Sequence, residues 1–318
     1  MTKQSGLGMA FYIDGYDLSG DTQQLSSVAA PMKPIDVTGI DKSAVERIPG
    51  LRDGLIDWVS FFDVATGTAH PVLSQLPTAD AGVMAVINKA IGGPAACMIG
   101  KQINYDPTRG TDGSLTFKVN AQANAYGLEW ANMLTAGTRT DTAATNGAAW
   151  DRGAGFATPS VPASTVPVTN TSSVPATVVI SGGTMTNVSV NGVTVGTGAG
   201  TYTVPAGGTI TMTYTVAPTW TWALQSSWGA QLYLQALAFT GTDATVTVQD
   251  SADNSTWANV SGASFTAITS SNQFQRIGLS NTATIRRYLR AITTTSGGFT
   301  SLAFAVAINV NTVAGVVF

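Results

Sequence analysis

Residues Thr209–Val216 read Thr-Ile-Thr-Met-Thr-Tyr-Thr-Val, a strict alternation of threonine with larger side chains. Successive side chains of a β-strand point to opposite faces, so the apolar and aromatic residues share one face and the threonines the other. Just upstream, Val188–Val195 carries Asn191-Gly192 between two alternating segments, the strongest short-range signal for a type I′ hairpin. Thr201–Val204 alternates in the same way. The sequence therefore predicts a compact β module here.

A long uncharged segment surrounds these strands. From Gly153 to Thr242 the chain contains no Asp, Glu, Lys, Arg or His, the residues from which acids, bases and most metal ligands are drawn. Residues 153–167 are rich in Pro, Ser and Thr and are predicted to form a linker. Residues 168–218, with about five strands, are predicted to form an immunoglobulin-like β-sandwich. The segment is thus expected to be structural.

The two flanking parts are also predicted to be mainly β. Residues 1–152 form one expected domain and residues 219–318 another, with short strands at hairpin spacing. Residues 70–76, with Pro71 near the start, are predicted to be the one short helix of the first part. The strands expected in the flanking parts are Leu55–Phe62, Gly82–Ile91, Ala95–Tyr105, Ser114–Asn124, Gln231–Phe239, Ala244–Asp250 and Phe299–Asn309.

Composition excludes several classes of function. Only 10% of residues are charged and the formal net charge is -3, which argues against tight nucleic-acid binding because few cations are present to neutralise phosphates. A single cysteine, Cys97, and a single histidine, His70, cannot build a disulfide framework or a Cys/His metal site. No signal peptide or membrane span is recognised, so folding in the host cytoplasm is expected. No cofactor, metal or catalytic residue is predicted.

Three segments carry a resemblance to phage tail proteins. Ile35–Gly54, with its Ile-Pro-Gly-Leu element, resembles the polar loop and following strand of phage major tail tube proteins, and Tyr105–Val119 is similar to a later loop and strand of that family. The opening Thr2–Gly8 resembles tail proteins of long-tailed, non-contractile (siphovirus-type) phages of actinobacteria.

This resemblance implies a tail-tube-like antiparallel β-barrel or sandwich that carries the immunoglobulin-like module as an insertion. Residues 219–318 would complete or duplicate the tube fold. The chain would assemble with itself into hexameric rings, or trimeric rings, that stack into a hollow tail in the virion. Other tail proteins would be partners, and phage DNA would pass through the lumen without specific binding. The loop is then a candidate contact between subunits, through Asp41, Glu46, Arg47, Ile48, Pro49, Leu51, Arg52 and Asp53.

One basic cluster stands out near the C-terminus, formed by Arg286, Arg287 and Arg290. It is open to two interpretations: contact with DNA, or ion pairing within the subunit or across rings with acids such as Asp41, Glu46 or Asp53. We favour ion pairing because no groove of alternating aromatic and basic residues accompanies the cluster.

Two other functions fit the composition. The turn at 249–257 resembles that of discoidin-like carbohydrate-binding domains, so a glycan-binding tail module for host recognition is one alternative. A capsid or decoration protein is another. An enzyme is not expected, because no converging acid, base and nucleophile can be named.

Overall fold

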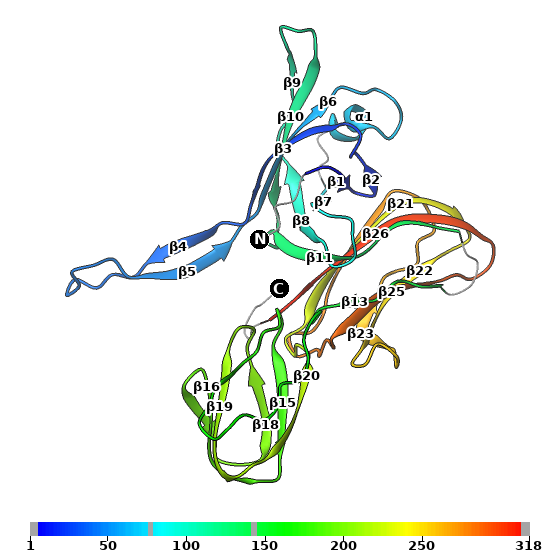
Figure 1. Cartoon of the computed structure of the whole chain (residues 1–318). Helices are drawn as coiled ribbons and strands as arrows, with labels where there is room; N and C mark the ends of the chain where they lie inside the picture. The colour runs from blue at the N-terminus through cyan, green and yellow to red at the C-terminus, as the bar shows by residue number, and fades with distance from the viewer. Residues whose placement is uncertain (1–5, 76–78, 141–144, 313–318) are drawn as a thin grey trace.

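The computed structural model describes residues 6–75, 79–140 and 145–312. Within them the chain is almost wholly β, and α1 (Ala69–Leu73) is the one helix. Figure 1 shows an N-terminal unit, a C-terminal unit beside it, a separate module below, and a two-stranded arm that projects away from all three. The mainly β fold predicted from the sequence is confirmed.

The N-terminal unit is a small sandwich from which two hairpins project, formed by the fourth and fifth strands and by the ninth and tenth strands. Its strands are β1 (Ala10–Ile13), β2 (Tyr16–Asp17), β3 (Thr22–Ala29), β4 (Met32–Asp36), β5 (Arg47–Arg52), β6 (Leu55–Phe61), β7 (Ala81–Val86), β8 (Pro94–Gln102), β9 (Asp106–Arg109), β10 (Leu115–Ala123) and β11 (Glu129–Arg139). β6 lies between β3 and β10, and the β4–β5 hairpin continues beyond the end of that sheet.

The C-terminal unit begins earlier in the chain than residue 219. Its strands are β12 (Thr145–Asn146), β13 (Trp150–Asp151), β21 (Ala230–Gly241), β22 (Thr245–Ser251), β23 (Ala258–Ser264), β24 (Gln273–Gly278), β25 (Tyr288–Thr294) and β26 (Phe299–Val310). Both β12 and β13 pair with β25. The end of the segment that we assigned to the N-terminal domain therefore belongs to the C-terminal sheet.

One sheet runs through both units, in the strand order β2-β1-β7-β8-β11-β26-β21-β24. It curls so far that β24 packs over β7, where a Cβ atom on Gly82 would lie 2.0 Å from the Phe274 ring. The inside of the curl is filled by small and sulfur-containing side chains with a few aromatic rings, among them Ala95, Cys97 and Tyr233. The two units are thus joined by a buried core as well as by backbone pairing.

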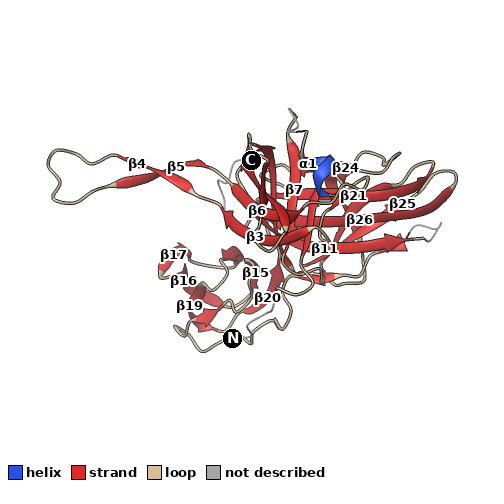
Figure 2. Cartoon of the chain, turned by 90° about the horizontal axis from the view of Figure 1, so that it is seen from above, coloured by secondary structure: helices blue, strands red, loops and turns tan. Residues whose placement is uncertain are grey.

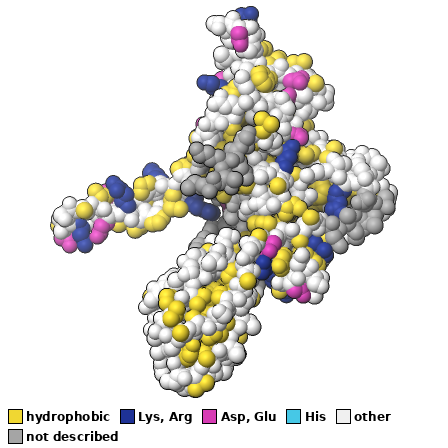
Figure 3. Space-filling model, in the orientation of Figure 1, with side chains coloured by type: hydrophobic (Ala, Val, Ile, Leu, Met, Phe, Trp, Pro, Cys, Tyr) yellow, Lys and Arg dark blue, Asp and Glu magenta, His cyan; other side chains and the backbone are white. Residues whose placement is uncertain are grey.

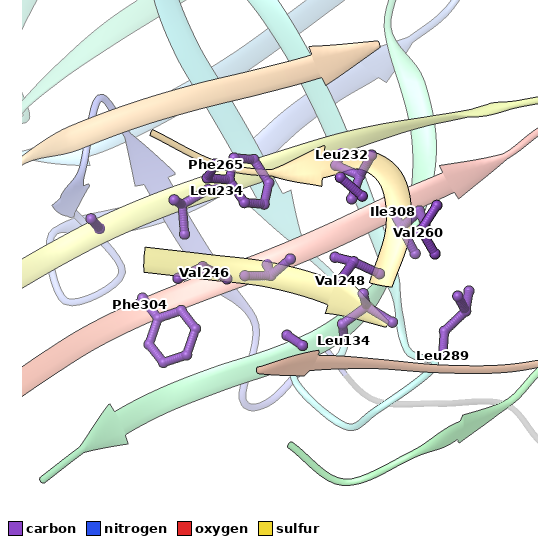
Figure 4. Packing of buried hydrophobic residues seen from close by; sticks show 14 of the residues in the cluster. Leu134, Leu232, Leu234, Val246, Val248, Val260, Phe265, Leu289, Phe304 and Ile308 are labelled. Carbon is purple, nitrogen blue, oxygen red and sulfur yellow. The ribbon is translucent and has the colours of Figure 1, made fainter. Parts of the chain in front are cut away.

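Each unit also has a core of its own on the other face of the shared sheet. In the N-terminal unit, α1 covers one end of a core that includes Phe11, Trp58 and Phe117. In the C-terminal unit, alternate residues of the long strands β21 and β26 point inward against β22 and β25, as Figure 4 shows for Leu232, Leu234, Phe304 and Ile308. This alternation is the period-two geometry of a β-strand.

The module is a seven-stranded sandwich of two sheets. Its strands are β14 (Val168–Thr169), β15 (Ala176–Ser181), β16 (Thr184–Val190), β17 (Val193–Gly196), β18 (Gly200–Val204), β19 (Thr209–Val216) and β20 (Thr219–Leu224). The sheets have the orders β14-β19-β16-β17 and β18-β15-β20. Asn191 and Gly192 have φ angles of 52° and 80°, as a type I′ turn requires.

The order of strands differs from the immunoglobulin arrangement. There the first strand shares a sheet with the second, and the last strand with the sixth. Here the first strand, β14, pairs with the sixth, β19, and the last, β20, pairs with the second, β15. The sandwich architecture was predicted, but the topology and the number of strands were not.

The boundaries of the module also differ from those predicted. Trp220 and Trp222 lie in β20 and face the module core, because β20 pairs along all of β15. The expected linker, residues 153–167, runs along the module: Trp220 Nε1 donates to the Pro159 carbonyl at 2.8 Å, and Phe156 packs 5.9 Å from Trp222. The module therefore ends after Leu224, and its linker forms part of its packing.

Candidate subunit interface

The β4–β5 arm is a two-stranded ladder that stands clear of the rest of the chain in both Figure 1 and Figure 2. Ile35 pairs with Ile48 and Asp36 with Arg47, and the ladder is extended by a hydrogen bond from Val37 N to the Glu46 carbonyl at 3.0 Å. Six residues of strand span about 20 Å. The arm is long enough to reach well beyond the body of its own subunit.

The arm exposes more aliphatic surface than any other short segment described. Seven of its large hydrophobic side chains are exposed, namely Met32, Ile35, Val37, Ile40, Val45, Ile48 and Leu51. Ile40, at the tip, is fully exposed, and Leu51 is 87% exposed. Figure 3 shows hydrophobic side chains, in yellow, along the arm among basic and acidic groups. Exposed apolar surface of this extent is characteristic of a protein–protein contact.

All eight residues predicted as a contact loop lie on this arm or at its base. Asp41 and Glu46 belong to the tip, where Glu46 forms an ion pair with Lys42, with Lys42 Nζ 3.3 Å from Glu46 Oε1. The predicted residues Arg47, Ile48, Pro49, Leu51 and Arg52 lie in β5. At the base, Asp53 N donates to the Pro31 carbonyl at 2.9 Å. The segment read as a polar loop is thus mostly an exposed β-hairpin.

The base of the arm contacts a buried polar cluster that the sequence did not indicate. The Glu129 side chain is completely buried, and it accepts a hydrogen bond from the Tyr233 hydroxyl. Arg276 Nη2 lies 3.4 Å from Glu129 Oε1, and Arg52 Nη2 of the arm lies 4.0 Å from the same oxygen. The Arg276 guanidinium also stacks over the Tyr126 ring at 3.7 Å. Four segments far apart in the chain meet on one carboxylate.

Burial controls the protonation of this cluster. Removal from water raises the pKa of Glu129 above its ordinary value, although Tyr233, Arg276 and Arg52 all favour the ionised form. The same burial, with the Glu129 charge nearby, raises the pKa of Tyr233 and of the Cys97 thiol. Glu129 is the one charged residue between Lys118 and Arg139, and this isolation is the only signal that could have marked it.

The three arginines of the basic cluster are engaged within the chain. Arg287 makes two hydrogen bonds to the Asp151 carboxylate at 2.7 and 2.8 Å, and these hold the pKa of Asp151 below its ordinary value. Arg286 lies 3.9 Å from Asp250. Arg290 donates to Gln249 and stacks over Trp257. Within the chain the partners are two acids, an amide and an aromatic ring of the C-terminal unit, and not Asp41, Glu46 or Asp53.

A buried arginine next to this cluster joins the module to the C-terminal unit. Arg152 is 3% exposed and donates to the carbonyls of Ile285 and Arg286, while Ser173 of the module donates to the Arg152 carbonyl. Burial lowers the pKa of Arg152 to about 10, partly offset by the charge of Asp250. These bonds fix the point at which the module leaves the C-terminal sheet.

The turn within residues 249–257 is held by hydrogen bonds of its own residues. Asp253 accepts hydrogen bonds from the backbone of Ser255 and Thr256 and from the Ser251 hydroxyl. Among the described residues, no group of three or more His, Cys, Asp or Glu side chains is placed to hold a metal ion. In the same part of the chain, no helix is both long and apolar enough to cross a membrane.

Comparison with known proteins gives distant structural likenesses only. No family model matches the chain, and no curated protein sequence matches it. Among solved structures, the Dit protein of phage SPP1, described as a hub of the adsorption apparatus, is 12% identical over 95% of this chain and 99% of its own, with a TM-score of 0.25. Two structures of the phage p2 baseplate in its activated conformation, with Sr and with Ca, are 9% and 10% identical. They cover 94% and 95% of this chain and 97% and 98% of their own, with TM-scores of 0.29. Scores of this size do not establish a common fold, so the function is argued from the arm.

Proposed function

We propose that the chain is a structural component of a phage tail, and specifically a major tail tube subunit that self-assembles into stacked rings. The observation that carries this proposal is the β4–β5 arm, which exposes seven large aliphatic side chains far from the core of its own subunit. Hydrophobic surface of this kind gains free energy when another protein covers it. The arm also coincides with the segment whose sequence resembles the tail tube family.

The open edges of the sheets support assembly through backbone pairing as well. Among the described strands, β3 pairs only with β6, and β24 at the far end of the shared sheet pairs only with β21. Unpaired edges are a hazard for a monomer and an asset for a subunit whose neighbours continue its sheets. Hexameric rings are proposed, with trimeric rings as the alternative if the two sheet-sharing units each contribute one segment of the wall.

The charge of the chain suits a channel for DNA. The formal net charge is -3, and the one basic cluster is engaged by acids, an amide and an aromatic ring of the same chain. A wall with few free cations would let phosphates pass without strong contacts. In this proposal the protein resides in the virion after assembly in the host cytoplasm, with other tail proteins as partners, and it has a structural and not an enzymatic role.

Electron microscopy of the purified chain tests this function. Hollow tubes of uniform diameter, and a large copy number of the chain in purified virion tails, are the expected results. Closed shells would favour the capsid or decoration alternative instead. A protein that stays monomeric at high concentration and binds on a glycan array would favour the host-recognition alternative.

A further inference from the structure

A groove lies between the two units, on the side of the molecule opposite the arm. Its volume is about 770 Å³. The β1–β2 hairpin and α1 form one wall, and the end of β21 with part of β26 forms the other. In Figure 1, α1, β2 and β21 lie to the right, while the β4–β5 arm extends to the left. A subunit therefore cannot place its own arm in its own groove.

The groove combines apolar walls with hydrogen-bond acceptors. Val72 and Leu237 contribute partly exposed apolar surface, and Asp17 contributes an exposed carboxylate. No Lys, Arg or His is among the described residues that line it. The groove is thus suited to an aliphatic side chain accompanied by a cation.

One buried acceptor in the lining has no partner. Gln102 is 6% exposed, and its amide nitrogen donates to the carbonyls of Leu73 at 2.7 Å and Asn104 at 3.1 Å. Its carbonyl oxygen, Oε1, is buried without a hydrogen bond. Because this oxygen has no contact with solvent, a side chain entering the groove does not reach it, and Asp17 carries the exposed carboxylate there.

The tip of the arm has the complementary chemistry. Ile40 is fully exposed, and Lys42 follows it by two residues, with a side chain held only by the exposed pair with Glu46. Such exposed pairs contribute little and exchange partners readily. Lys33 and Arg47, further along the arm, make no ion pair that the structure records.

We propose that the arm tip of one copy docks in the groove of a second copy, with Ile40 against the apolar wall and Lys42 facing Asp17. This inference rests on the proposed function and names the surface that receives the arm. The two surfaces differ and lie on opposite sides of one subunit, so the contact is heterologous. Contacts of this kind propagate head to tail into rings or open polymers.

Charge reversal on both sides tests the pairing. Lys42→Glu alone and Asp17→Lys alone each place like charges together, and each should raise the concentration needed for assembly about tenfold or more. Combining both substitutions in one chain restores opposite charges at every contact, whatever the number of copies in a ring. This double variant should assemble as the wild type does, which light scattering and electron microscopy would show. Both substitutions are at exposed side chains, and circular dichroism checks that each variant is folded.

Disulfide trapping gives a second readout. A chain with Ile40→Cys and Ala238→Cys, the latter at an exposed position in the groove, should form covalent ladders on oxidation. The native Cys97 is fully buried and does not compete. The matched control is Ile40→Cys with Val193→Cys, an exposed position on the module, which should give no ladder.

The outcomes separate the two proposals. If the wild-type chain fails to assemble under any condition, the proposed function and this inference both fall. If the wild type assembles while the charge-reversed single variants assemble equally well, or the double variant does not recover and no ladder forms, another surface receives the arm. In that case the docking inference is wrong and the tail function stands.

Discussion

At the scale of single residues, Glu129 has the largest consequence for stability. Its buried carboxylate is the shared partner of Tyr233 and Arg276 and lies close to Arg52. Glu129→Leu leaves Arg276 buried without its counter-charge, and such a break costs about 3–5 kcal/mol. Urea denaturation should show this loss. As the control, Glu46→Leu removes only the exposed pair with Lys42 and should change the free energy of unfolding by less than about 1 kcal/mol.

Glu129 also sets a dependence of stability on pH. Because burial raises its folded-state pKa, the folded chain retains a proton that the unfolded chain releases above about pH 4.3. The free energy of unfolding should therefore fall as pH rises from there through the folded-state pKa, and then level off. Glu129→Gln has no such titration. Urea midpoints of both chains across this window measure the difference, and parallel curves would contradict it.

At the scale of elements, the arm is expected to be dispensable for folding. Its residues contribute nothing to the four hydrophobic cores. Replacing residues 33–51 with an Asn-Gly turn should leave the unfolding free energy nearly unchanged and abolish assembly, because the exposed aliphatic surface is lost. Sedimentation velocity should then report only monomers. Polymers from the armless chain would contradict the role given to this element.

Elements with a clear period were predictable, and those without one were not. β19 coincides with the alternating Thr209–Val216, and β6 and β10 lie within one residue of their predicted ends. The arm was read as a loop from its resemblance to the tail tube family, and Pro34, Pro49 and several charges interrupt any alternation that could have indicated strands. A two-stranded ribbon that is exposed on both faces needs no apolar period, so its sequence resembles a loop.

The Glu129 cluster was missed for a different reason. Its members come from β11, β21, β24 and the end of β5, and they meet only because the shared sheet curls on itself. A sequence pattern reports neighbours a few residues apart. The members of this cluster, such as Arg52 and Arg276, lie far apart in the chain. The basic cluster was found because its three arginines lie within five residues of one another in the chain. Their partners were not predicted.

At the scale of the whole molecule, the module is expected to be separable from the rest. Arg152 N donates to the Arg287 carbonyl, and Ser226 N donates to the Ile285 carbonyl. The two ends of the insertion therefore lie beside the same segment, which leads into β25. Joining Arg152 to Ser226 by a short Gly/Ser linker should give a folded chain that still assembles. Electron microscopy should show thinner tubes of unchanged axial repeat. Loss of assembly would mean that the module takes part in the contacts between subunits.

The uneven distribution of charge makes trypsin a reporter of assembly. No lysine or arginine lies between Arg152 and Arg276, so the protease has no cleavage site in the module or in most of β21 to β24. The exposed arm, by contrast, offers bonds after Lys42, Arg47 and Arg52. Free subunits should therefore be nicked first in the arm, and docking of the arm should suppress that nick. Gel electrophoresis of digests at increasing protein concentration would follow polymerisation by the survival of the intact chain.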